Sequence, residues 1–280
     1  MESGLAELDL SLPFWEDYRP ALQRLTGPGF PTADALSALL PAGLRSHGGR
    51  PVRFVPASSI PDVSYESHIF STGQVSTRAE NWHDLFNALV WSRFPRLKTA
   101  MNALHVTDQD GSRTSGRGRM RDALTLLDES GAIVVSTDRD SLDCVAHHDW
   151  GAVYTSGFSP APGANKSRQL SIFLCGHALL EKFLRPYKSI TAQVLLVAVD
   201  EAGSSSPREQ LLDRLDHALA DALMAGRLFK SPADLAPLPL MGIPGWWPPG
   251  DQDEAFYGDK DVFRPLGDRA RPAPVFSLPL

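Results

Sequence analysis

The sequence predicts a mixed α/β fold: a small sheet flanked by helices, in one globular domain with an extended C-terminal tail. Apolar, β-branched segments alternate with helical patterns in the second half of the chain, at 132–136, 138–149, 170–175, 177–185 and 191–199. Such continuous apolar strands indicate a sheet that is covered on both faces. The tail from Pro232 is rich in Pro, Gly and Trp. Because Pro fixes φ and lacks an N–H donor, this tail is expected to wrap the domain as extended chain.

The composition suits such a domain. The chain has 280 residues, 42% hydrophobic and 21% charged, which is enough for one full core without disulfides. Cys144 and Cys175 form no CxxC pair, which excludes a thiolate zinc site and fits a reducing compartment. A net charge of −6 argues against nucleic-acid partners. We find no secretory signal and no run of about 18 apolar residues, so we expect a cytoplasmic protein without a membrane partner.

The elements before the sheet can be placed in order. Residues 1–60 form an N-terminal helical segment, 61–231 the core and 232–280 the tail. Two short helices lie within 14–45, and short strands lie at 51–56 and 65–70. The turn signal Thr72-Gly73 favours a hairpin over 65–76. Helices are then predicted at 82–91, from Pro95, at 119–129 and at 207–225.

The helix at 82–91 has an apolar stripe at the spacing of one buried face, formed by Trp82, Leu85, Phe86, Leu89 and Val90. His83 and Asn87 lie one turn apart on another face, with Asp84 beside them. Asn81 as N-cap and Asp84 at the third helical position resemble a capping box, which gives Asp84 a structural explanation. His83 and Asn87 have no such explanation, so they indicate a functional site.

Two further clusters carry histidine. Lys98, Asn102 and His105 form one polar stripe on the next helix, which follows so closely that His83 and His105 are expected to share a pocket. His177 begins a helix directly after a buried strand, where ligand sites of open α/β sheets gather. The helix N-terminus keeps its imidazole neutral. Glu181, one turn further on, can share a metal ion with it. The structural alternative is a local His–Glu hydrogen bond.

Charged groups on the third helix have simpler explanations. Arg113, Arg117, Arg119 and Arg121 could hold a phosphate at a helix start or belong to a solvated loop. Asp128-Glu129-Ser130-Gly131 has ordinary turn composition, and Asp122 is expected to pair with a nearby arginine.

A different alternative starts from His68. A hairpin at 65–75 followed by the helix at 82–91 resembles the ββα-metal nuclease finger, in which His68 would be the base, Asn81 its orienting partner, and His83 or Asn87 a metal ligand. Ser67 stands where that finger usually has an Asp or His ligand, and the acidic chain lacks a clear DNA-binding surface.

Long ordered blocks at 65–105, 121–135, 176–192 and 235–265 carry a family resemblance. They include "ENWHDLFNALVWSRFPRLK", "RDALTLLDESGAIVV", "GHALLEKFLRPYKSITA" and "LAPLPLMGIPGWWPP". The chain resembles the bacterial domain-of-unknown-function 3025 family from about residue 10 to about residue 265. This resemblance implies no activity, so function has to be argued from the residues.

We interpret these patterns as a metal-dependent enzyme, most simply a hydrolase of a small molecule, with one divalent ion such as Zn, Fe or Mn. The predicted metal ligands come from His83, His105, His177 and Glu181. Asp84, His83 and His177 are the candidate catalytic residues. The candidate substrate-binding residues are Asn87, Lys98, Asn102, Arg119 and Arg121. The alternative is a non-catalytic module that binds a metabolite or partner, with these clusters as structural networks. An enzyme requires the histidines to converge on one cleft.

Overall fold

The computed structural model describes residues 4–25, 27, 29–109, 115–158, 169–200, 206–248 and 250–280. Its main sheet has the strand order β4-β3-β5-β6, and β7 also pairs with β5. The strands are β3 (Gly131–Ser136), β4 (Ser171–Leu174), β5 (Thr191–Ala198), β6 (Ala236–Pro239) and β7 (Val275–Ser277). Strands β3 and β7 run parallel to β5, whereas β4 is antiparallel to β3 and β6 is antiparallel to β5.

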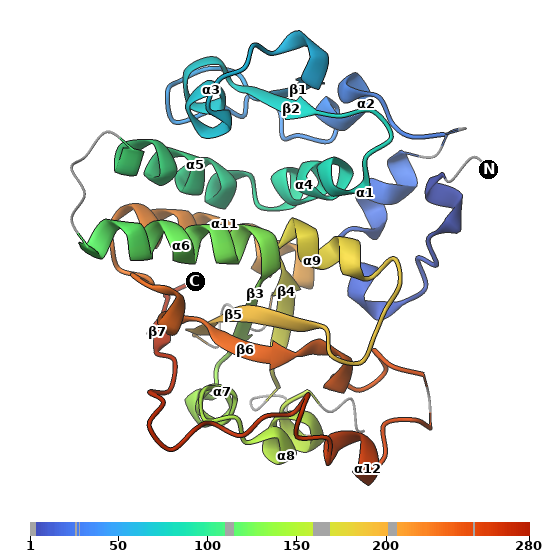
Figure 1. Ribbon diagram of the computed structural model, residues 1–280, viewed down its shortest axis with the longest axis vertical. Coiled ribbons are helices and arrows are strands. Elements are labelled where there is room, and N and C mark those ends of the chain that lie inside the picture. Colours follow the sequence, from blue (N-terminus) through green and yellow to red (C-terminus); the bar gives the residue numbers. More distant parts are fainter. Residues whose placement is uncertain are drawn as a thin grey trace.

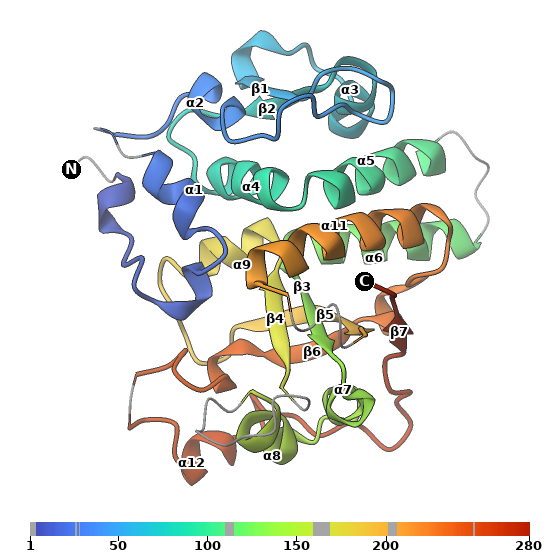
Figure 2. The same cartoon turned by 180° about the vertical axis from the view of Figure 1, so that it is seen from behind.

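Helices cover both faces of this sheet, as Figures 1 and 2 show. On one side lie α6 (Ser115–Ser130), α9 (His177–Lys182) and α11 (Arg208–Met224), and on the other lie α7 (Arg139–Ala146) and α8 (Trp150–Ala152). Every residue of β3 is buried, which explains why its sequence is a continuous apolar run rather than an alternating one. The predicted mixed α/β class is therefore confirmed.

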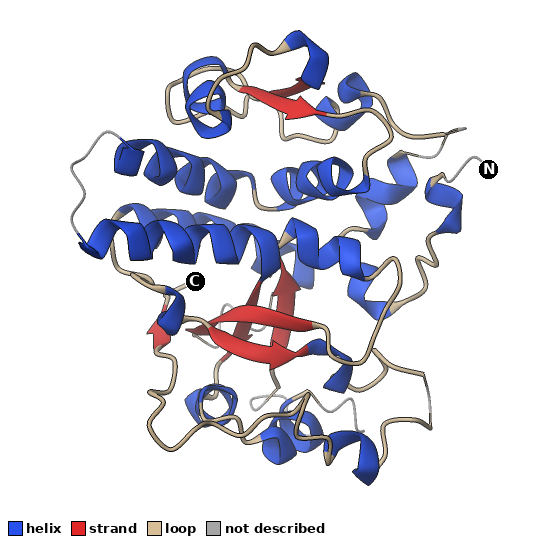
Figure 3. Ribbon diagram, in the orientation of Figure 1, coloured by secondary structure: helices blue, strands red, loops and turns tan. Residues whose placement is uncertain are grey.

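A second helical layer lies above α6 and α11 (Figure 1). It consists of α4 (Trp82–Arg93) and α5 (Pro95–Gln109), and α5 contacts both α6 and α11. Above it, a two-stranded sheet pairs β1 (Arg53–Pro56) with β2 (Gln74–Thr77). Figure 3 shows the small sheet apart from the main one. At the N-terminal side lie α1 (Arg19–Arg24) and α2 (Ala33–Ser37), within the range 14–45 where two short helices were predicted.

The predicted hairpin at 65–76 is wrong. Residues Tyr65–Thr72 form a helix, α3, and β1 and β2 pair in parallel across it. Gly73 is left-handed, with φ 74, and its N–H donates to the Ile69 carbonyl, so the Thr72-Gly73 signal belongs to a helix C-cap rather than to a hairpin turn. The nuclease-finger alternative loses its structural basis, because His68 is helical and its Nε2 lies 3.2 Å from Gln74 Oε1.

The C-terminal tail contributes more to the sheet than expected. It contains β6, β7 and the short helix α12 (Glu254–Tyr257), and β6 lies at a sheet edge, where its prolines are tolerated. Further short helical turns among the described residues are Leu5–Glu7, Pro13–Trp15, Ala57–Ser59, Val153–Gly157, Pro232–Asp234 and Leu240–Gly242. Within the described part of the chain, we find no helix with the length and apolar character of a membrane span. The division into 1–60, 61–231 and 232–280 stays a prediction.

Candidate metal and substrate site

The site begins at two junctions in the chain, one between α6 and β3 and one between β4 and α9. Helix α6 ends at Ser130 and β3 begins at Gly131 with no loop between them. After β4, the N–H groups of Cys175 and Gly176 both donate to the Gly131 carbonyl, at 3.0 and 2.8 Å. A Cβ at Gly176 would lie 2.3 Å from the Gly131 nitrogen, so only glycine permits this approach. The result is that His177, the first residue of α9, lies against the C-terminal end of α6.

Helix α4 supplies the second histidine. Asn81 is the N-cap, as predicted, because its Oδ1 accepts from the Asp84 N–H at 3.0 Å. His83 therefore lies in the first turn of α4, and α4 contacts α9. The rings of His83 and His177 meet edge to face, with centroids 4.4 Å apart and an interplanar angle of 74°.

The two rings present the same atom to each other. His177 Nε2 lies 3.0 Å from His83 Nε2, and His83 Nδ1 lies 3.1 Å from Glu181 Oε2. Because an ionised carboxylate can only accept, His83 donates its Nδ1 proton to Glu181, which leaves a lone pair on Nε2. That lone pair faces His177 Nε2, so the space between the rings has to hold either one shared proton or a cation.

Glu129 completes a cluster of possible metal ligands. One ligating atom from each of His83, Glu129 and His177 lies within 4.8 Å of the others, and Glu129 Oε2 is 3.6 Å from His177 Nε2. Two ligands of a tetrahedral zinc ion are roughly 3.3 Å apart when each bond is near 2.1 Å. The distances of 3.0 Å between the two Nε2 atoms and 3.6 Å from His177 Nε2 to Glu129 Oε2 lie on either side of that value.

Burial keeps His177 neutral, although Asp128 behind the ring acts to raise its pKa. Burial lowers the pKa of His177 to about 4, so the ring has a free lone pair at neutral pH. Asp128 Oδ2 lies 3.8 Å from His177 Nδ1, and Asp128 Oδ1 lies 2.5 Å from Lys98 Nζ. Burial alone would raise the pKa of Asp128, but Lys98 and His177 outweigh it and lower that pKa. Burial and the neighbouring Asp128 raise the pKa of Glu129.

The histidines open onto a cavity of about 320 Å³. Its wall includes His83, His105 and His177, so the three histidine segments do meet there. His105 stands outside the ligand cluster, and Glu181 contacts the far side of the His83 ring. The other lining residues are Tyr65, Glu66, Ser76, Arg78, Asp84, Asn87, Arg121, Thr125, Asp128 and Glu129.

Predicted polar residues take different places around this cavity. The Asp84 carboxylate accepts from the Arg78 backbone N–H at 2.6 Å and from the Arg78 guanidinium at 2.7 and 3.0 Å. Burial favours a higher pKa for Asp84, but Arg78 outweighs burial and lowers it. Asn87 Nδ2 donates to the Tyr65 hydroxyl at 3.0 Å. Arg121 lines the cavity and Arg119 does not. Arg113 and the side chain of Arg117 lie outside the described residues.

Lys98 and Asn102 line a smaller cavity of about 10 Å³, next to Glu66, Trp91 and Asp128. That volume is about the size of one water molecule. Asn102 Nδ2 donates to the Glu66 backbone oxygen and to Glu66 Oε2, at 2.9 and 2.6 Å. Within the described residues, several buried polar atoms at the two cavities have no hydrogen-bond partner: Asn87 Oδ1, Trp91 Nε1, Asn102 Oδ1 and His177 Nδ1. Leaving such atoms unpaired is costly, so they indicate a site for water or ligand.

Sequence reasoning missed Glu129, Glu66, Tyr65 and Arg78 as site residues, and it treated Asp128-Glu129 as part of a turn. A usable signal was present on α6. Arg121, Thr125 and Asp128 follow one another at i, i+4 and i+7, which places them on one helix face. Glu66 and Tyr65 had no such signal, because the segment was predicted as a strand.

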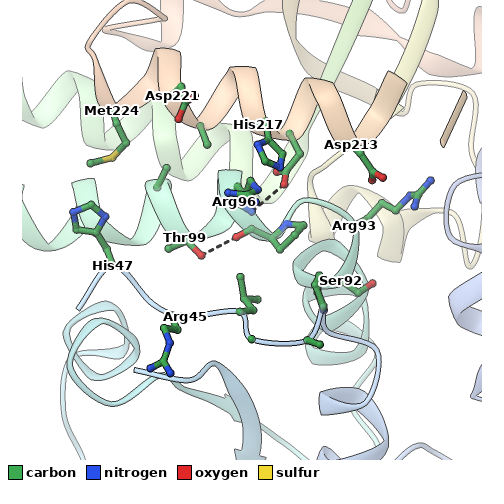
Figure 4. A pocket seen from close by; sticks show the side chains of 18 residues that line it. Arg45, His47, Ser92, Arg93, Arg96, Thr99, Asp213, His217, Asp221 and Met224 are labelled. Atoms are coloured by element: carbon green, nitrogen blue, oxygen red, sulfur yellow. Dashed lines mark hydrogen bonds between the residues drawn. The ribbon is translucent and has the colours of Figure 1, made fainter. Parts of the chain in front are cut away.

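A larger groove, of about 760 Å³, lies between the segment 41–47 and α11 and shares no lining residue with the histidine cavity. Figure 4 shows it with charged side chains such as Arg45, Arg96 and Asp213. Size alone does not identify a site. Throughout the described ranges, His83, Glu129 and His177 form the only three-residue group with metal-binding spacing, so the candidate site is the smaller cavity.

A comparison with family models matches residues 52–267 to the family described as "Protein of unknown function (DUF3025)". The match includes each residue of the ligand cluster. No curated protein and no solved structure matches the chain.

Proposed function

The chain belongs to the DUF3025 family, whose function is unknown, so its own residues have to carry the argument, and we propose that it is a metal-dependent hydrolase of a small molecule. One divalent cation is held by His83 Nε2, His177 Nε2 and Glu129 Oε2. Glu181 orients His83 from behind, in the manner of carboxylate–histidine–metal triads.

The observation that supports this proposal best is the pair of Nε2 atoms 3.0 Å apart. His83 has its proton on the opposite nitrogen, toward Glu181. Burial keeps His177 neutral. Two imidazoles and a carboxylate form a ligand set for zinc, iron or manganese that leaves positions open for water and substrate.

The chemistry follows from the cavity beside that ligand set. A cation with an open position lowers the pKa of bound water to about 7 and so supplies hydroxide at neutral pH. Asp84, one of the candidate catalytic residues, has a lowered pKa and is held by Arg78. We therefore assign Asp84 to holding Arg78 at the cavity wall, and we assign the nucleophile to water on the metal.

Metal analysis tests the proposal. The purified protein, reconstituted separately with zinc, manganese and iron and freed of excess metal, is expected to retain about one equivalent of one of them. His83→Ala, His177→Ala and Glu129→Gln should each weaken binding by about 100-fold or more, since each removes a ligand. His217→Ala, at an exposed histidine in the larger groove, is the matched control. The proposal would be contradicted if the reconstituted protein retained no metal, or if all three ligand variants retained as much metal as the unaltered protein.

A second candidate is a non-catalytic binding protein. The Nε2–Nε2 distance of 3.0 Å also fits a hydrogen bond from His177 Nε2–H to His83 Nε2, which would connect His177, His83 and Glu181 in one network. In that case the reconstituted protein retains no metal, and His83→Ala lowers stability without any change in metal content.

A further inference from the structure

We infer that the substrate of this site carries a phosphate group, bound between Arg121 and the metal. This inference rests on the proposed metal site and adds the substrate class. It starts from Arg121, which lines the cavity from α6 on the same helix face as Thr125 and Asp128.

Arg121 differs from the other arginine of the cavity in what it already binds. Arg78 is committed to Asp84 through its Nε and Nη2 atoms, at 3.0 and 2.7 Å. For Arg121, no hydrogen bond or ion pair is found among the described residues. Arg121 is exposed at the cavity wall. A guanidinium without a carboxylate partner at such a wall can bind an oxyanion with two hydrogen bonds.

The charge of the cavity makes anion binding depend on the metal. Glu66, Asp84, Asp128 and Glu129 line the cavity with four carboxylates, against the guanidinium groups of Arg78 and Arg121. Lys98, bonded to Asp128, adds a third positive charge. Glu181, bonded to His83, adds a fifth carboxylate. Negative charge therefore exceeds positive charge by two, and a divalent cation offsets that excess. An anionic substrate is accepted only when the metal is present.

A phosphate uses these partners better than a carboxylate. A phosphate monoester has three terminal oxygens, so one can face the metal while two meet the guanidinium fork, whereas a carboxylate has only two oxygens. The Thr125 hydroxyl is a further donor on the same wall. A volume of about 320 Å³ suits a phosphate with a small organic group.

The reaction then takes place at phosphorus. The oxygen of the metal-bound water forms a new P–O bond, and the ester P–O bond breaks with its electron pair on the leaving oxygen. That oxygen takes a proton derived from the water. The products are an alcohol and inorganic phosphate, and no oxidant or co-substrate is needed.

Calorimetric titration with inorganic phosphate tests this assignment. The metal-loaded protein is expected to bind phosphate, and the metal-free protein is expected to bind at least about tenfold more weakly. Arg121→Gln should weaken phosphate binding to the metal-loaded protein by about tenfold or more, since it removes charge-assisted hydrogen bonds. Arg119→Gln, two residues earlier on α6, exposed and outside the cavity lining, should bind phosphate like the unaltered protein.

Each result separates this inference from the proposal beneath it. The phosphate assignment is overturned if the metal-loaded protein does not bind phosphate, or if Arg121→Gln and Arg119→Gln bind it equally well. Either result leaves the proposed metal site intact. Protein that retains no metal overturns both. Thermal melts of the two variants, with and without metal, show whether a loss of binding reflects a loss of folding.

Discussion

At the residue scale, the site depends on an ion pair between buried Lys98 and partly buried Asp128. Lys98 is only 7% exposed, and its Nζ lies 2.5 Å from Asp128 Oδ1. The other Asp128 oxygen faces His177 Nδ1. Breaking a buried pair leaves one charge without compensation, whereas replacing both partners can be much less costly. The main effect of the pair is therefore to fix the position of Asp128 beside His177. Its contribution to the net free energy of unfolding is small.

Lys98→Met is accordingly expected to lower the free energy of unfolding by about 3–5 kcal/mol, because Asp128 stays buried without its cation. The double variant Lys98→Met, Asp128→Asn should recover part of that loss. Urea denaturation of both variants at pH 7 measures the difference. A double variant that is no more stable than Lys98→Met would show that the ion pair does not carry this energy.

Helical spacing identified His83, Asn87 and His105 as candidate site residues, and the place of His177 directly after a buried strand identified the fourth. Only the structure shows that all four line one cavity. Helical spacing was not enough for Glu129. The letters Asp-Glu-Ser-Gly are typical of a turn, and nothing local indicates that α6 continues through Ser130. Glu129 reaches the site through the hydrogen bonds from Cys175 and Gly176 to Gly131, which join segments more than forty positions apart.

At the element scale, α5 is capped by a distant residue. The N–H groups of Arg96 and Leu97 donate to the Asp216 carboxylate of α11, at 3.0 and 2.9 Å. Asp216 is 3% exposed. Burial raises the pKa of Asp216 to about 6, although the two N–H groups act to lower it. The contact ties the first turn of α5 to α11 and so helps to set the position of α5 beside the site.

This raised pKa predicts a pH dependence of stability. The folded state holds the Asp216 proton more tightly than the unfolded state, whose pKa is 3.8. The contribution is therefore fully present below about pH 4 and is lost as the pH rises to about 6. Relative to Asp216→Asn, the unaltered protein should lose on the order of 3 kcal/mol between pH 4 and pH 7.

Urea denaturation at both pH values measures that difference, with Asp221→Asn, an exposed position on the same helix, as the control. A stability difference between the unaltered protein and Asp216→Asn that stays constant over this range would contradict the prediction.

Most elements were predictable because their periodicity is strong. The helices expected at 82–91 and 207–225 are α4 at Trp82–Arg93 and α11 at Arg208–Met224. The failure at 65–76 has a local cause. Tyr65–Phe70 mixes β-branched and aromatic residues with polar ones, and only the parallel pairing of β1 with β2 makes a crossover helix necessary there.

At the scale of the whole molecule, β5 is the strand on which the sheet depends. It pairs with β3 on one side and with β6 and β7 on the other. The C-terminal segment is therefore part of the core: Leu238, Leu240 and Met241 are each 0% exposed. The Tyr154 hydroxyl also donates to the Pro239 carbonyl at 2.6 Å.

A chain that ends at residue 231 is expected to lose its cooperative folding transition. Burial of the apolar side chains in 232–280 contributes on the order of 10 kcal/mol, which is comparable to the whole stability of a domain. Thermal unfolding followed by near-ultraviolet circular dichroism measures the outcome. A deletion of 279–280 alone, beyond β7, should keep the transition. A truncated chain with an unchanged transition would show that the segment only wraps a self-sufficient core.

The pairing of His83 with His177 and Glu181 joins positions 94 and 98 residues apart. During synthesis on the ribosome, His83 leaves the exit tunnel well before its partners exist. The proposed ion can bind fully only after α9 has been made and the sheet beneath it has begun to form. Metal loading would then be a late step of biosynthesis, and a nascent chain stalled before residue 177 would not compete for the metal of the cell.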